Sequence, residues 1–141
     1  MTHQGSCLCG KTTFSIKEAS LEVSACHCGM CRRWTSGPLL SIEAGNSENI
    51  TFDNEDNIGR YQSSEWAERG FCKNCGSSLF YHGLTDDSYY IPVDLLKDIN
   101  GAKLVLEIMY DNKPDYYCFS NDTKKMTQAD IYQQFVEETS E

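Results

Sequence analysis

The chain has 141 residues, and its 21 Asp and Glu residues outnumber its 12 Lys and Arg residues, which gives a net charge of −9. This acidic balance argues against a general nucleic-acid-binding surface, which needs a basic footprint, and against binding to an anionic membrane. The length predicts a single domain over residues 1–141.

Eight of the residues are cysteines. The N-terminus is polar, so it does not resemble a signal peptide, and no apolar run approaches the roughly 20 residues that span a bilayer. We therefore expect a cytoplasmic protein. Thiols stay reduced in that compartment, where clusters of cysteine indicate metal binding or catalysis more often than disulfides.

Short β-branched and aromatic runs, separated by turn signals such as Gly45-Asn46 and Asp53-Asn54, predict a mainly β fold with antiparallel sheets. In chain order, the expected strands are 12–16, 21–25, 39–42, 50–52, 59–62, 66–71, 77–82, 89–93 and 104–110.

A short helix is expected at the C-terminus. Thr127 can cap it, with Asp130 three residues later in an imperfect capping box. The helix would carry a narrow apolar stripe of Ile131, Phe135, Tyr132 and Val136. This stripe would pack against the sheets or against a partner chain.

Seven of the cysteines fall into three clusters, which are Cys7/Cys9, Cys26/Cys28/Cys31 and Cys72/Cys75. Structural zinc takes four protein ligands, whereas catalytic zinc takes three and keeps one position open. Clusters of two, three and two divide most simply into four plus three, which predicts two zinc ions per chain. Spacing alone leaves another division open, in which Cys7 and Cys9 join two thiols of the central cluster.

The outer clusters have the local features of a closed zinc site. Gly76 follows the C-x-x-C of Cys72 and Cys75, where a glycine can take the positive φ of a sharp bend. If Cys7 and Cys9 lie in an extended segment, both thiols point to one side and Leu8 points into the core. The rival interpretation, a redox dithiol at Cys72 and Cys75, lacks the βαβ context that it requires.

The central cluster is the candidate for chemistry. Three thiolates with one open position suit a fourth soft ligand such as a substrate thiol. The alternative is a closed site in which His27 supplies the fourth ligand, with His3 and His82 as outside candidates. Lone Cys118 is expected to be a buried apolar residue.

Arg32 and Arg33 follow the central cluster directly and form a local positive patch in an acidic chain. They are candidates for binding an anionic end of the substrate, because Arg pairs bidentately with carboxylates. The plainer interpretation is two solvated or structurally paired arginines. Trp34 can line the substrate pocket or pack in the core.

The ordered motifs resemble the glutathione-dependent formaldehyde-activating enzyme family, which includes centromere protein V. The matching segments are Gly5-Ser6-Cys7-Leu8-Cys9-Gly10, Cys26-His27-Cys28-x-x-Cys31-Arg32-Arg33, Arg69-Gly70-Phe71-Cys72-x-x-Cys75-Gly76-Ser77 and Lys113-Pro114-x-x-Tyr117. The resemblance covers about residues 3–120 and leaves 121–141 as a C-terminal extension.

The resemblance implies an Mss4-like antiparallel β fold. It also implies a structural zinc on Cys7, Cys9, Cys72 and Cys75 and a second zinc on Cys26, Cys28 and Cys31. The family's nominal reaction joins formaldehyde to glutathione and belongs to the carbon–sulfur lyases. Our leading hypothesis is therefore a zinc-dependent lyase acting on a thiol adduct, with glutathione or a related thiol as its partner. The alternatives are a non-catalytic two-zinc scaffold that binds a protein partner and a sensor that loses its three-thiol zinc on oxidation.

Overall fold

The computed structural model describes residues 2–139 of the chain, which form two compact units. Unit 1 contains residues 2–21 and 41–102, and unit 2 contains residues 22–40 and 103–139. Each unit holds one of the two candidate metal groups. The prediction of a single domain stays a prediction.

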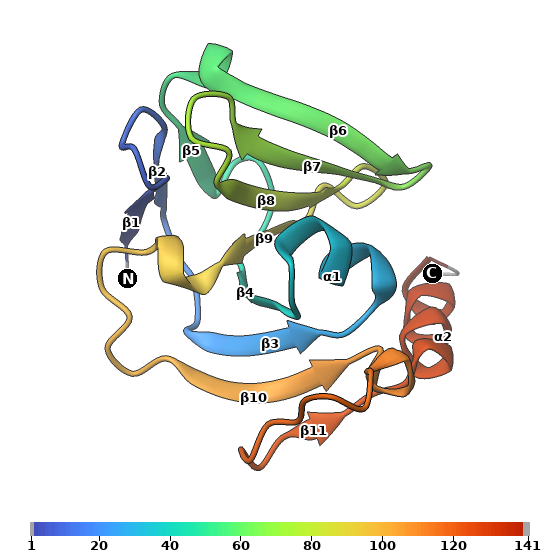
Figure 1. Cartoon of the computed structure of the whole chain (residues 1–141). Helices are drawn as coiled ribbons and strands as arrows, with labels where there is room; N and C mark the ends of the chain where they lie inside the picture. The colour runs from blue at the N-terminus through green and yellow to red at the C-terminus, as the bar shows by residue number, and fades with distance from the viewer. Residues whose placement is uncertain (1, 140–141) are drawn as a thin grey trace. The chain divides into compact units, whose positions relative to one another are not determined.

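Unit 1 is built from antiparallel strands. Its smaller sheet has the order β1-β2-β5, and a second series of strands runs in the order β4-β9-β8-β7-β6 (Figure 1). The strands are β1 (His3–Ser6), β2 (Thr13–Ile16), β4 (Leu39–Glu43, of which residues 41–43 belong to unit 1), β5 (Ile50–Phe52), β6 (Ile58–Ser64), β7 (Ala67–Cys72), β8 (Ser78–Gly83) and β9 (Tyr89–Pro92). Two 3-10 turns, η1 (Glu55–Asn57) and η2 (Val93–Leu95), follow β5 and β9.

An aromatic cluster forms much of the core of unit 1. The Phe52 ring lies 5.6 Å from Phe14 and 5.2 Å from Phe80, and Phe80 lies 5.3 Å from Tyr89. Burial of large apolar side chains is the main stabilising contribution in a domain of this size. The cluster therefore ties the small sheet to β8 and β9.

Unit 2 contains β3 (Glu22–Cys26), α1 (Gly29–Thr35), β10 (Lys103–Ile108), η3 (Tyr110–Asn112), β11 (Lys124–Lys125) and α2 (Gln128–Thr139). Strand β10 lies between β3 and β11 and runs parallel to both of them (Figure 1). The prediction of a mainly β fold with a short C-terminal helix is confirmed. The prediction of antiparallel pairing is confirmed in unit 1. It is wrong for the pairs β10–β3 and β10–β11, which are parallel.

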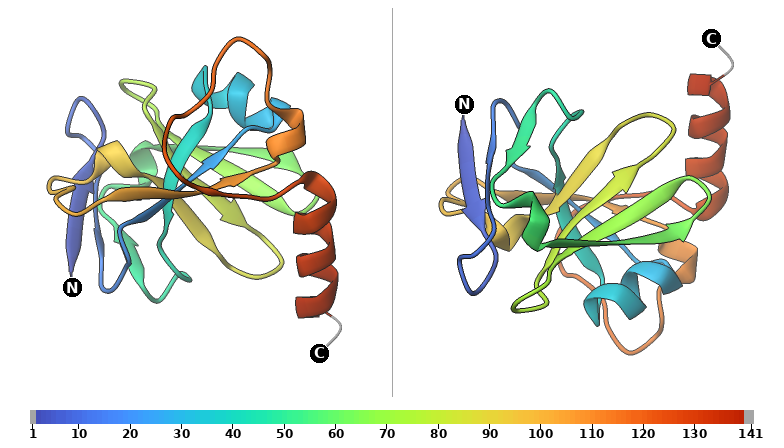
Figure 2. Two further views of the ribbon diagram at one scale, coloured as in Figure 1. Left: turned by 90° about the horizontal axis from the view of Figure 1, so that it is seen from below. Right: turned by 90° about the horizontal axis from the view of Figure 1, so that it is seen from above.

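Helix α2, red in Figure 2, begins with the expected capping box. The Asp130 carboxylate accepts from the Thr127 backbone N–H at 2.9 Å, and the Asp130 N–H donates to the Thr127 hydroxyl at 3.1 Å. Tyr132, Phe135 and Val136 are about half exposed, so these side chains are not buried against the sheets, and packing of the stripe against a partner chain stays a prediction. Among residues 2–139, no helix is long and apolar enough to cross a membrane.

Candidate metal centres

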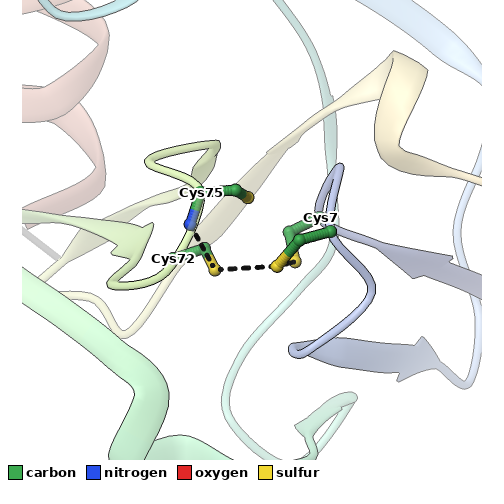
Figure 3. Close-up of side chains that lie close together, drawn as sticks. Cys7, Cys72 and Cys75 are labelled. Carbon is green, nitrogen blue, oxygen red and sulfur yellow. Dashed lines mark hydrogen bonds between the residues drawn. The ribbon is translucent and has the colours of Figure 1, made fainter.

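Four thiols of unit 1 converge on one point. The sulfur atoms of Cys7, Cys9, Cys72 and Cys75 all lie within 4.8 Å of one another. The Cys9 sulfur is 3.6 Å from that of Cys7 and 3.7 Å from that of Cys72. Zn–S bonds of 2.3 Å in a tetrahedron place the sulfurs about 3.8 Å apart, so the group fits a zinc ion. Figure 3 shows side chains from the two loops pointing toward one another.

Two tight turns bring these thiols together. The Gly10 N–H donates to the Cys7 carbonyl, and the Gly76 N–H donates to the Cys72 carbonyl. Both glycines have a φ near +80°, which other residues rarely adopt, and the prediction for Gly76 is thereby confirmed. The expected extended segment at Cys7–Cys9 is wrong: it is a turn, and Leu8 is 88% exposed instead of buried.

Hydrogen bonds to sulfur favour thiolates in this group. The hydroxyl and backbone N–H of Ser77 lower the pKa of Cys75 to about 5. Burial tends to raise the pKa of Cys72, but N–H donors that include the Cys75 backbone and the Asn57 amide lower it overall. Burial raises the pKa of Cys7. Because metal ligands must lose their protons, the donors prepare this group for a cation.

Three thiols of unit 2 form a second group. The Cys26, Cys28 and Cys31 sulfurs also lie within 4.8 Å of one another. Cys26 ends β3, Cys28 is the N-cap residue of α1 and accepts a hydrogen bond from the Cys31 N–H at 3.3 Å, and Cys31 lies inside the helix. A strand end followed by a helix start therefore gathers the three sulfurs. The thiols of Cys28 and Cys31, together with burial, raise the pKa of Cys26, because a thiolate there would lie close to two other sulfurs.

The histidines are engaged elsewhere. His27 is fully buried, and its ring nitrogens are hydrogen-bonded to Tyr117 and Glu107 instead of facing the sulfurs. His3 contacts the Ala19 carbonyl, and His82 lies between two carboxylates. Within the part of the chain that the structure describes, no fourth His, Cys, Asp or Glu ligand atom joins the three-thiol group.

The candidate substrate residues lie in α1, directly after Cys31. The Arg32 side chain donates to the backbone carbonyls of His27 at 2.9 Å and of Asn112 at 3.4 Å, so part of it is committed to the fold. Arg33 is exposed, and Trp34 is half-buried. The geometry therefore favours Arg33 over Arg32 for contact with a ligand from solution.

Sequence reasoning missed two residues beside the second group. Glu107 is 1% exposed although it is charged, and Tyr117 contacts the ring of His27. A lone carboxylate among the apolar residues of 104–108 was the available signal for the first. The signal for the second was the Lys113-Pro114-x-x-Tyr117 motif. Cys118, which was expected to be buried, is exposed and belongs to neither group.

Residues 2–112 match the model of the family described as glutathione-dependent formaldehyde-activating enzyme. The chain belongs to this family. All seven clustered cysteines fall inside the matched region. Both groups of this family member can bind a metal ion.

Two relatives extend the comparison. An uncharacterised lyase of Schizosaccharomyces pombe is 33% identical over 135 residues, which are 95% of this chain and 97% of the yeast protein. A crystal structure of a Rhodobacter sphaeroides protein has a TM-score of 0.58 at 22% identity and covers 70% of this chain and 91% of the bacterial one. The yeast protein supports a lyase-type function for this member of the formaldehyde-activating family. The bacterial protein supports the fold alone.

Proposed function

We propose that this protein is a zinc-dependent carbon–sulfur lyase that acts on a thiol adduct of the glutathione–formaldehyde type. The observation that carries the proposal is the convergence of the three sulfurs of Cys26, Cys28 and Cys31. The family's description and the lyase name of the yeast relative support it. Cys7, Cys9, Cys72 and Cys75 would hold a second, structural zinc.

The reaction forms or breaks one carbon–sulfur bond. In the synthetic direction, the thiol sulfur bonds to the carbonyl carbon, the C=O π bond becomes an O–H bond, and the thiol proton balances the new hydroxyl. Zinc on three thiolates would favour the substrate sulfur as thiolate at neutral pH. Cys26 and Cys28 are half-buried, so that solvent reaches their side of the group, while Cys31 is anchored inside α1.

Arg33 would bind an anionic end of the substrate, such as a glutathione carboxylate. It is exposed in the helix that follows Cys31, and a guanidinium pairs well with a carboxylate. Arg32 would position the metal-binding segment through its hydrogen bond to the His27 carbonyl. Trp34 would form a wall of the site from the same helix.

The test combines a metal count with turnover. Zinc is counted by native mass spectrometry, and adduct formation from glutathione and formaldehyde is followed by NMR with the uncatalysed rate subtracted. We expect two zinc ions and turnover in the wild type, and one zinc ion without turnover in Cys28→Ser. Cys118→Ser is the matched control, because this exposed thiol lies outside both groups, and it should keep both metals.

Two results would contradict the proposal. Cys28→Ser with two zinc ions and full activity would remove the three-thiol group from the mechanism. A wild-type protein with two zinc ions, no turnover and a fourth side chain on the second ion would favour the non-catalytic scaffold instead.

A further inference from the structure

His27 is fixed at every one of its polar groups. Its backbone N–H donates to the Ile108 carbonyl at 3.1 Å, and its own carbonyl accepts from Arg32 Nε at 2.9 Å. Its ring nitrogens lie 2.8 Å from a Glu107 carboxylate oxygen and 2.7 Å from the Tyr117 hydroxyl oxygen. A residue between two candidate metal ligands is thus held by four hydrogen bonds within unit 2.

The ring is also enclosed by aromatic side chains. The Tyr117, Phe119 and Tyr110 rings lie 5.5, 5.9 and 6.0 Å from it, and His27 itself has no exposed surface. A buried side chain with both nitrogens paired has one preferred orientation, because any rotation leaves a polar atom unsatisfied.

Glu107 determines which ring nitrogen of His27 carries the hydrogen. Burial tends to raise the pKa of Glu107, but the hydrogen bonds from Thr123 and His27 outweigh it, so the pKa lies below its ordinary value. The ionised carboxylate can only accept hydrogen bonds, which places a hydrogen on His27 Nε2. In the neutral tautomer Nδ1 then accepts from the Tyr117 hydroxyl. The Thr123 hydroxyl, 2.5 Å from the second carboxylate oxygen, fixes Glu107 in turn.

We propose that His27 is the positioning residue of the three-thiol site. Its hydrogen bonds to Glu107 and Tyr117 hold the sulfurs of Cys26 and Cys28 where both can bind one metal ion. This deepens the proposed function, because it rests on metal binding by Cys26, Cys28 and Cys31. It adds that residues of the 107–117 segment, which supply no ligand, set the affinity and geometry of the metal. Partners of this kind change metal affinity by roughly 10–100-fold when they are removed around known sites.

The experiment uses full-length protein that is first given one equivalent of Zn²⁺ to fill the four-thiol group and then titrated with Co²⁺. Co²⁺ affinity is measured by competition with a chelator, and the ligand-field and sulfur-to-cobalt charge-transfer bands report the geometry. The variants are His27→Asn, Glu107→Ala, Glu107→Gln and Tyr117→Phe. A variant with Cys31→Ser provides the blank for the second site.

We expect His27→Asn and Glu107→Ala to weaken Co²⁺ binding about 10–100-fold and to shift the bands. Glu107→Gln keeps an oxygen acceptor for Nε2–H, and so it should bind about tenfold more tightly than Glu107→Ala. Tyr117→Phe removes only the hydroxyl and should weaken binding less than Glu107→Ala. Tyr117→Phe also tests the proposal if His27→Asn and Glu107→Ala do not fold.

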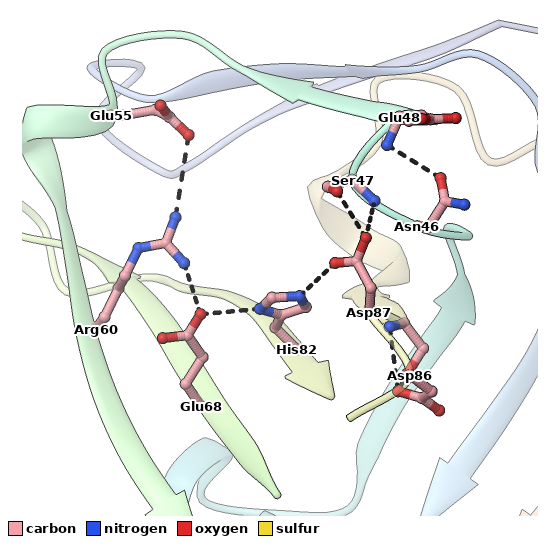
Figure 4. A network of polar contacts seen from close by, with 10 residues as sticks. Asn46, Ser47, Glu48, Glu55, Arg60, Glu68, His82, Asp86 and Asp87 are labelled. Carbon is pink, nitrogen blue, oxygen red and sulfur yellow. Dashed lines mark hydrogen bonds and ion pairs between the residues drawn. The ribbon is translucent and has the colours of Figure 1, made fainter. Parts of the chain in front are cut away.

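The matched control is His82→Asn in unit 1. His82 also bridges two groups through both ring nitrogens, 2.9 Å from Glu68 and 2.8 Å from Asp87, but it flanks no cysteine cluster (Figure 4). Its substitution should leave the Co²⁺ bands and affinity unchanged.

The outcomes separate this inference from the function on which it rests. A wild-type protein that takes up no Co²⁺ at the three-thiol group would overturn both. If the wild type binds Co²⁺ and the three variants Tyr117→Phe, Glu107→Gln and Glu107→Ala bind it with the same affinity and bands, only the positioning role is overturned. If the variants are less stable but their Co²⁺ bands are unchanged, His27 supports the fold alone. That result also overturns the positioning role.

Discussion

Asp87 is a carboxylate held at a turn residue with a φ of +53°. One carboxylate oxygen accepts from the Ser47 hydroxyl at 2.6 Å and from the Ser47 backbone N–H at 3.0 Å, and the other lies 2.8 Å from the His82 ring (Figure 4). The hydrogen bonds from Ser47, followed by that from His82, lower the pKa of Asp87 to about 2. The ionised form is therefore the one that the folded chain stabilises.

The pKa shift of Asp87 predicts a pH dependence of stability. An unfolded Asp titrates near pH 4, so ionised Asp87 stabilises the fold fully above that pH, and the contribution is lost as the pH falls from about 4 to about 2. The free energy of unfolding of wild type minus that of Asp87→Asn should be positive at pH 5 and should shrink as the pH falls from about 4 to about 2. Urea unfolding at each pH measures it, and metal loss in acid, common to both proteins, cancels in the difference. A gap that widens in acid would contradict the prediction.

Substitution of Arg33 and substitution of Arg32 should have different consequences. Arg33→Ala should weaken binding of glutathione roughly tenfold, the size expected for one lost charge-assisted hydrogen bond, with both zinc ions retained. Arg32→Ala should instead lower the stability of unit 2, because its side chain donates to the His27 and Asn112 carbonyls. Isothermal titration with glutathione and urea unfolding distinguish the two effects. Equal binding by Arg33→Ala and wild type would remove Arg33 from the site.

Element α1 was invisible to sequence reasoning for physical reasons. It has seven residues, begins at Gly29 and carries no repeated apolar face, so neither propensity nor periodicity signals a helix. Its start is defined by the Cys28 side chain, which accepts from the Cys31 N–H. A thiol that serves as a cap and as a candidate ligand is not a sequence signal of a helix.

The strands that were predicted share a clear pattern, and those that were missed do not. Residues 50–52 were placed correctly, and most other boundaries lie within two residues of the observed ones, because apolar runs end at turn residues. His3–Ser6 is polar with a glycine, and Lys124–Lys125 has two residues, so neither shows alternation. Parallel pairing of β10 was missed because alternation reports which face is buried, not the direction of the neighbour.

Strands β7 and β8 contact closely at Gly70. A Cβ atom there would lie 2.2 Å from the ring of Phe80, which is only 1% exposed and cannot move aside. Gly70→Ala should therefore lower the free energy of unfolding by about 1–3 kcal/mol. Gly37→Ala is the control, since nothing lies within 4 Å of its Cβ position, and it should be neutral or slightly stabilising. Urea unfolding in excess Zn²⁺ compares the two variants. An equal decrease in the free energy of unfolding of both would mean that the close contact at Gly70 does not affect stability.

At the scale of the molecule, the two units gather their thiols in different ways. The four-thiol group of unit 1 joins residues that are 63 positions apart in the chain, as for Cys9 and Cys72. The three-thiol group of unit 2 comes from six consecutive residues. Closing the long loop is opposed by chain entropy, which a metal bound by four thiolates can offset, since structural zinc contributes about 10 kcal/mol in small domains. The four-thiol group was assigned from the family resemblance, because spacing alone left another division open.

This difference predicts that metal leaves the protein in two steps. A chelator should first remove zinc from Cys26, Cys28 and Cys31, because three ligands hold it less tightly than four and solvent reaches two of them. Hydrogen exchange should then rise in residues 22–40 and 103–139. Zinc held by the four-thiol group should leave more slowly, and its loss should unfold residues 2–21 and 41–102.

Zinc release followed by a chromogenic chelator, with hydrogen exchange measured by mass spectrometry on the same samples, tests this order. Cys31→Ser should abolish the fast phase and keep the slow one, while Cys118→Ser should keep both, because Cys118 lies in neither group. Release of both ions in one phase, with exchange rising in both units at once, would contradict the assignment of one metal to each unit. Slow release from the three-thiol group would instead indicate that its fourth position is filled by the protein, because an open position is what gives a chelator direct access to the ion.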